Sequence, residues 1–192
     1  MTARTIILFC VAVAAWGRDP IAVDFAIDSP GWGGEVITLP PGFAPDMRIK
    51  GVEDIRFAPG MFKPGAADFF SYIFVIASTA GQRMESAFIR QELLVYFQGL
   101  AKSVSKGSID PSNFVFDLQR LKAKGPHAVY RGTLDWVEPF ATRKPQKLHL
   151  DLHVQTHAGK DYLIVCVSPQ SPEHAVWSTL RTVRRSFRLV AP

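Results

Sequence analysis

Hydrophobic and polar residues alternate strictly along residues 147–157, KLHLDLHVQTH. Leucines and a valine occupy the even positions from 148 to 154, and histidines, Asp151 and Gln155 occupy the odd positions from 149 on. Because successive side chains of a strand point to opposite faces, this period of two predicts a strand with one apolar and one polar face. Shorter alternating segments, ended by turn residues, predict further strands within residues 35–39, 53–57, 114–121, 127–140 and 160–170.

Two helices and one fully buried strand complete the pattern. Residues 68–78, DFFSYIFVIAS, are apolar on both alternating faces, which is typical of a central strand covered on both sides. Apolar residues recur three or four apart from Glu85 to Val104 and predict a helix. The same spacing predicts a second helix from Pro172 to Arg188, whose arginines face outward: Arg181, Arg184, Arg185 and Arg188.

These elements predict an α+β fold with an antiparallel β-sheet, because successive strands have short connections. With GWGGEVITLPPGF near the start, YRGTL in a late strand and DYLIVCV after it, the order of elements resembles the PsbP-like superfamily, including its DcrB-like and Ran-binding import-factor relatives. Proteins of that family typically end in a tryptophan-bearing helix and a Ser-Phe pair, matched here by Trp177, Ser186 and Phe187. The resemblance covers nearly the whole chain after residue 17. It implies an α/β/α sandwich, a sheet flanked by helices, with a binding or assembly role, and it assigns no functional residue.

The first residues have the layout of a secretory signal peptide. Arg4 precedes an apolar run that ends at Trp16, and small residues follow. The run is shorter than the roughly 20 apolar residues that span a bilayer. We expect cleavage after Gly17, or alternatively after Ala14, so that residues 18–192 form a single domain without an integral membrane segment. The alternative interpretation is a buried N-terminal strand.

Composition narrows the class of protein. With 192 residues, 47% of them hydrophobic, the chain can bury a sizeable core in one domain. After signal removal Cys166 is the one remaining cysteine, in an apolar strand, and we expect a buried, inert thiol. The net charge of +5 is modest and lacks the dense basic stripe of a nucleic-acid-binding protein. We therefore expect a secreted or periplasmic protein with no nucleic-acid partner.

The polar face of residues 147–157 is a candidate zinc or copper site formed by His149, Asp151 and His153. Residues two apart on one strand face lie about 6.6 Å apart, so one strand offers at most two ligands to one ion. Further ligands would have to come from elsewhere, with four candidates in the sequence: His127, His174, Glu138 and Asp135. The alternative is a solvated face that holds no ion.

Two other groups of side chains are candidate contact surfaces. The outward arginines of the last helix, Arg181, Arg184, Arg185 and Arg188, could bind an anion or a partner, or could simply be solvated. Aromatic and apolar residues around the glycine-rich GWGG segment could line a partner patch if exposed, or pack at the edge of the sheet: Trp32, Phe43, Met61 and Phe62.

No common catalytic motif occurs in the sequence, whether nucleophile elbow, P-loop, H-E-x-x-H, C-x-x-C or dinucleotide fingerprint. A triad assembled from distant positions stays open. The sequence favours a non-catalytic binding or accessory domain, without a resident cofactor, that meets a protein partner in the cell envelope. Two alternatives remain. One is a small hydrolase or metal-dependent enzyme with a dispersed site, and the other is a metal-binding protein that uses the strand His149 to His157.

Overall fold

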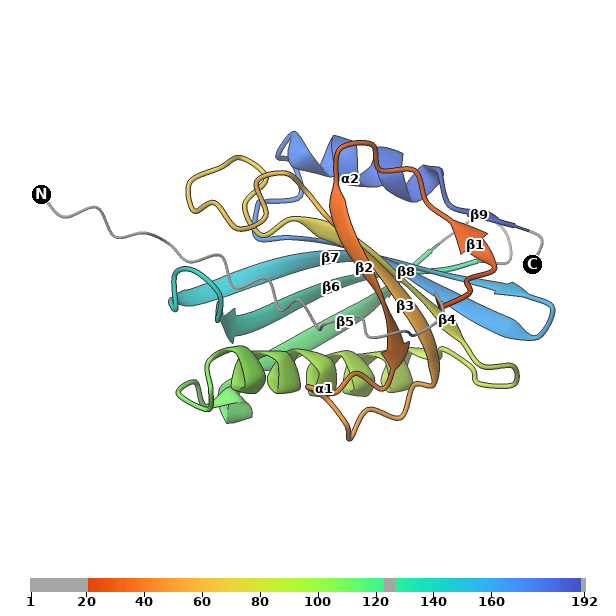
Figure 1. Cartoon of the computed structure of the whole chain (residues 1–192), viewed down its shortest axis with the longest axis horizontal. Coiled ribbons are helices and arrows are strands. Elements are labelled where there is room, and N and C mark those ends of the chain that lie inside the picture. Colours follow the sequence, from red (N-terminus) through yellow and green to blue (C-terminus); the bar gives the residue numbers. More distant parts are fainter. Residues whose placement is uncertain (1–20, 123–126, 191–192) are drawn as a thin grey trace, which may run out of the picture.

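A computed structural model describes residues 21–122 and 127–190 of the chain. The expected signal peptide, residues 1–17, lies outside the described residues. The main strands are β2 (Gly33–Leu39), β3 (Gly51–Phe57), β4 (Tyr72–Ser78), β5 (Val115–Leu121), β6 (Ala128–Val137), β7 (Pro145–His157) and β8 (Lys160–Ser168). They form a seven-stranded antiparallel sheet in the order β2-β3-β4-β8-β7-β6-β5 (Figure 1).

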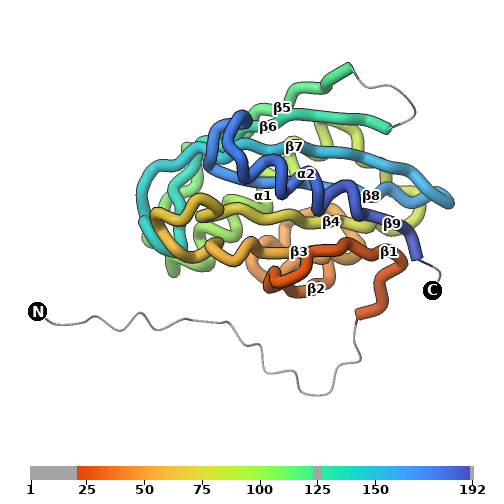
Figure 2. The backbone as a smooth tube through the Cα atoms, turned by 90° about the horizontal axis from the view of Figure 1, so that it is seen from above, coloured from red at the N-terminus to blue at the C-terminus, as the bar shows by residue number. Residues whose placement is uncertain are grey.

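Each face of the sheet carries one helix. Helix α1 (Ser86–Val104) packs against one face, and the shorter α2 (Val176–Arg185) crosses the other face over β4 and β8 (Figures 1 and 2). Beside α2, β1 (Phe25–Ala26) pairs with β9 (Arg188–Leu189), and a short helix η1 (Pro111–Asn113) precedes β5. The predicted α+β fold, an antiparallel sheet flanked by helices, is confirmed.

The two central strands are buried on both faces. Every residue of β4 is buried, and so is every residue of β8 except Lys160. Phe74 and Ile76 join the larger core under α1, while Ile73 and Val75 join a smaller core under α2 with Trp177. The prediction that residues 68–78 contain a central strand covered on both sides is therefore confirmed.

The last helix is shorter than the sequence pattern indicates. It begins at Val176 and ends at Arg185, so Pro172 precedes it and Arg188 lies in β9. The Ser186 hydroxyl accepts a hydrogen bond from the Asp28 backbone N–H at 2.8 Å and donates to the Val183 carbonyl at 2.6 Å. These contacts turn the chain toward β1. The prediction of a helical Arg188 is wrong because two-residue strands show no recognisable alternation.

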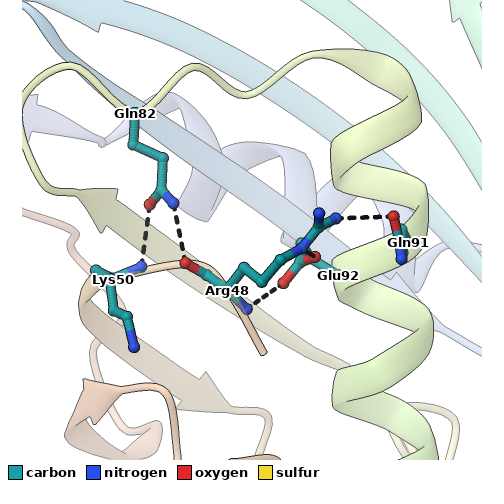
Figure 3. A network of polar contacts seen from close by, with 5 residues as sticks. All are labelled: Arg48, Lys50, Gln82, Gln91 and Glu92. Atoms are coloured by element: carbon teal, nitrogen blue, oxygen red, sulfur yellow. Dashed lines mark hydrogen bonds and ion pairs between the residues drawn. The ribbon is translucent and has the colours of Figure 1, made fainter. Parts of the chain in front are cut away.

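A network of polar contacts fixes the connection between β2 and β3 onto α1 (Figure 3). The Arg48 side chain donates to Glu92 Oε1 and to Gln91 Oε1 on α1, each at 2.7 Å. The Gln82 amide accepts from the Lys50 backbone N–H and donates to the Arg48 carbonyl, each at 3.0 Å. The larger core is thereby closed at its edge by charged and amide groups rather than by apolar packing alone.

One carboxyl group lies inside the larger core. Glu53 on β3 is fully buried, and its Oε1 accepts a hydrogen bond from the Tyr96 hydroxyl of α1 at 3.2 Å. Its Oε2 has no partner among the described residues. Burial raises the pKa of Glu53 to about 8, the Tyr96 hydrogen bond opposes that rise, and the nearby charges of Glu35 and Asp54 add to it. Glu53 is therefore protonated at neutral pH.

Replacing Glu53 with glutamine should remove a pH-dependent loss of stability. The folded protein keeps this proton up to a pH of about 8, whereas the unfolded chain releases it near 4.5. The free energy of unfolding should therefore fall as the pH rises through this window, by up to about 1.4 kcal/mol per unit from this group. Urea unfolding across the window should show a flatter profile for Glu53→Gln than for the wild type. The exposed Asp46→Asn variant serves as control, and an unchanged slope in Glu53→Gln would contradict the assignment.

Candidate binding surface

The polar sides of β5, β6 and β7 form one surface beside α2, which we name the polar sheet face. Strand register places Gln119, Arg131 and Asp151 in one row across the three strands. A neighbouring row holds Asp117, Thr133 and His149. The face comprises Asp117, Gln119, Arg131, Thr133, His149, Asp151 and His153.

The alternation in residues 147–157 produces this face as predicted. Leu148, Leu150 and Leu152 are fully buried in the larger core, while His149, Asp151 and His153 are half-buried on the opposite side. Helix α2 packs on β4 and β8, and β7 lies next to β8 in the sheet. The helix therefore borders the histidine row of β7 without covering it. The row is therefore neither a bare solvated face nor a buried one.

Two arginines of α2 turn toward the polar sheet face. Arg181 donates from Nε to Asp151 Oδ2 at 3.1 Å, and Arg184 Nη1 lies 3.0 Å from His153 Nδ1. On the other side of the same carboxylate, Arg131 Nε lies 3.9 Å from Asp151 Oδ1. The histidine strand and the basic helix, predicted as separate candidate surfaces, thus form one surface.

The prediction that all four late arginines face outward needs correction. Arg181 and Arg184 contact β7. Arg185 is exposed and donates to the Thr182 hydroxyl at 2.9 Å. Arg188, in β9, contacts Asp28 at 2.8 Å. A helical wheel shows which residues share a helix face, but the partners of that face depend on the strand order, in which β8 separates β4 from β7.

Both histidines of the face favour the neutral form. Burial, then the Arg184 guanidinium, lowers the pKa of His153 to about 4, although Asp151 opposes the shift. Burial and the Lys147 charge lower the pKa of His149. Because arginine can only donate, His153 Nδ1 is the acceptor in its contact with Arg184. Three arginines, Arg131, Arg181 and Arg184, thus contact either Asp151 or the neutral His153.

Arg131 is the residue of this face that sequence reasoning missed. It lies in the segment YRGTLDW, where Tyr130, Leu134 and Trp136 are buried, so its position on the polar side follows from the same alternation. The alternation that places Arg131 on the polar side is visible in the sequence. The partner of Arg131 is not, because its pairing with Asp151 depends on the register between β6 and β7.

The candidate metal ligands His149, Asp151 and His153 share one face, but other groups already occupy them. The Asp151 carboxylate contacts two guanidinium groups, and His153 Nδ1 accepts from a third. Glu138, a candidate further ligand, accepts backbone N–H bonds within its own loop. Within residues 21–122 and 127–190, no three His, Cys, Asp or Glu side chains are grouped as a metal site would need. Metal binding stays a prediction.

The metal hypothesis predicts competition between the ion and α2. Zinc or copper would have to displace the guanidinium of Arg184 from His153, because both need the imidazole lone pair. Calorimetric titration should then show tighter one-site binding in Arg184→Ala than in the wild type, and none in His153→Ala. An absence of binding heat in both the wild type and Arg184→Ala would leave the histidine row without a metal role.

The burial of His153, together with its contact with Arg184, should also make the fold sensitive to acid. The unfolded chain takes up a proton at His153 near pH 6.5, but the folded protein does so only near 4. This group should therefore lower stability as the pH falls from 6.5 toward about 4. Urea unfolding at both ends of this window should show a smaller loss for His153→Gln than for the wild type. The exposed His157→Gln variant, on the same strand, serves as the matched control, and equal losses in all three proteins would contradict the prediction.

Cys166 is buried, and burial raises the pKa of its thiol to about 12, as expected for an inert cysteine. Among the described residues, no side-chain hydrogen bond joins a serine or cysteine to a histidine. In the same part of the chain, neither α1 nor α2 combines the length and apolar character that a bilayer-spanning helix requires.

The chain is an α/β/α sandwich built on an antiparallel sheet. No protein-family model and no curated protein matches it. Among solved structures it is similar to the solution structure of cyanobacterial PsbP (CyanoP) from Synechocystis sp. PCC 6803, with a TM-score of 0.45 and 12% sequence identity. The match covers 91% of this chain and 98% of that chain. At this identity and TM-score the similarity assigns neither residue roles nor an activity to this chain.

Proposed function

We propose that this chain is a secreted or periplasmic, non-catalytic binding domain that recognises an acidic segment of a protein partner on its polar sheet face. The secretory location rests on the signal-peptide layout of residues 1–17. The binding role rests on the groups that surround Asp151.

The observation that carries the proposal is an excess of guanidinium groups on one open surface. Arg131 and Arg181 share a single carboxylate, that of Asp151, and Arg184 contacts the adjacent His153, which is neutral. The three guanidinium groups thus outnumber the one carboxylate that they contact. Guanidinium groups bind carboxylates and phosphates through paired, directional hydrogen bonds, so this surface suits an acidic ligand.

Arg131 is the group best placed to engage that ligand. Its side chain is 51% exposed, and its contact with Asp151 is long, at 3.9 Å. Arg181, in contrast, is held by Asp151 at 3.1 Å and lies over the Trp177 ring at 5.5 Å. The sheet and α2 thus hold one guanidinium in place and leave another free to turn toward a partner, with little conformational rearrangement required.

Binding of an acidic peptide should depend on Arg131. A fluorescent peptide of alternating glutamate and serine, titrated at low salt, should bind about tenfold or more weakly to Arg131→Gln than to the wild type, because one charge-assisted hydrogen bond is lost. Anisotropy would measure the affinity. Salt should weaken wild-type binding through screening.

Arg120 offers a matched control. It is an exposed arginine on β5 whose register partner is Tyr130, so it lies on the opposite side of the same sheet. Arg120→Gln should bind the peptide as the wild type does. Equal affinity of the wild type, Arg131→Gln and Arg120→Gln would exclude the polar sheet face as the site.

A further inference from the structure

A second surface lies at one end of the sheet, where the β3–β4 loop (residues 58–71) and the β6–β7 loop (residues 138–144) meet. Both loops extend from the same end of the molecule in two perpendicular views (Figures 1 and 2). Their exposed phenylalanines, Phe62 and Phe140, are 47% and 39% exposed and lie with ring centroids 5.8 Å apart. We name this surface, together with the exposed cations of the two loops, the aromatic end: Phe62, Lys63, Phe140, Arg143 and Lys144.

The two exposed rings rest on the core. Phe62 packs against Phe57 of β3 and Phe140 packs against the buried Phe70, each with ring centroids 5.8 Å apart. Of the apolar residues predicted as a possible patch, Met61 is buried, Phe43 packs edge-on against Tyr96, and Trp32 packs against the smaller core. Only Phe62 of that group is strongly exposed.

Buried or partly buried carboxylates hold both loops in one conformation. Glu138 is fully buried and accepts hydrogen bonds from the backbone N–H groups of Phe140, Ala141 and Thr142. Asp68 accepts from the Gly60 N–H at 2.9 Å, and a Cβ on Gly60 would lie only 1.9 Å from the Asp68 carboxylate. The exposed phenylalanines are thus presented by rigid loops.

The charges of the aromatic end have one sign. Lys63, Arg143 and Lys144 are exposed, whereas the only carboxylates of the two loops, Asp68 and Glu138, are turned onto backbone N–H groups. Apolar rings at loop tips, flanked by lysine and arginine, match the interface of a bilayer with anionic headgroups. A protein partner would more commonly be met by a broader apolar patch with a polar rim.

We propose that the aromatic end docks on a membrane surface rich in anionic phospholipid, with Phe62 and Phe140 entering the interfacial region and Lys63, Arg143 and Lys144 contacting headgroup phosphates. This docking uses a different surface from the one that we assign to the acidic partner. The protein would then bind its partner on the polar sheet face while its loop end lies on the bilayer.

Co-sedimentation with phospholipid vesicles tests this proposal. The assay uses the protein after signal-peptide removal, isolated from the compartment to which it is exported. Binding should be measurable on phosphatidylcholine vesicles containing phosphatidylglycerol and much weaker on phosphatidylcholine alone. The double variant Phe62→Ala/Phe140→Ala should lower the partition coefficient about tenfold, because the apolar surface that enters the interface is lost. Lys63→Glu/Lys144→Glu should lower it by at least as much, and more strongly at low salt.

Matched variants make the outcome decisive. Leu189→Ala removes an exposed apolar side chain of β9, and Lys122→Glu reverses an exposed lysine beyond the far end of β5, so both should bind vesicles as the wild type does. Circular dichroism melts would verify that each variant folds. The proposal is overturned if the wild type ignores phosphatidylglycerol, or if the double phenylalanine variant binds unchanged. It is equally overturned if Arg131→Gln, rather than the loop variants, abolishes vesicle binding, since the membrane would then contact the polar sheet face.

Discussion

The burial of β4 and β8 on both faces is the constraint on which the rest of the structure depends. A strand whose alternating side chains are all apolar requires cover on both sides, so the sheet needs a helix on each face. The two covers differ in length: α1 has 19 residues and α2 has 10. Because the shorter helix covers little more than β4 and β8, the polar faces of β5, β6 and β7 remain open beside it.

This difference in helix length explains why polar side chains lie on the open faces of β5, β6 and β7. On the α1 side, β7 contributes four buried apolar residues to the larger core: Leu148, Leu150, Leu152 and Val154. On the other side it meets the edge of α2, where an apolar row would be partly exposed and a fully charged row would be partly desolvated. Half-buried imidazoles, and one aspartate held between arginines, avoid both of these costs.

Much of the fold could be predicted from the sequence because two signals were strong. Period-two alternation located β6 and β7, and the helical period located α1 within one residue at its start. Contacts that join distant segments could not be predicted in the same way. The approach of Arg184 to His153 depends on β8 lying between β4 and β7, and the place of Arg188 in β9 depends on a two-residue partner near the start of the chain. Neither leaves a periodic trace in the sequence.

The buried carboxylates show how the candidate surfaces are kept rigid. Glu92 accepts from a backbone N–H beside β3, Glu138 from the β6–β7 loop, and Asp161 from the Met84 N–H that precedes α1. In each case backbone N–H donors replace the water that the carboxyl group loses on burial. The hydrogen bonds so formed fix a connecting segment to the sandwich. Glu53 differs, because its one protein donor is a tyrosine hydroxyl and its second oxygen lacks a partner among the described residues. Burial therefore neutralises Glu53 instead of pairing it, and its carboxyl group contributes to the core as a protonated acid, whereas the others hold the loops by accepting backbone hydrogen bonds.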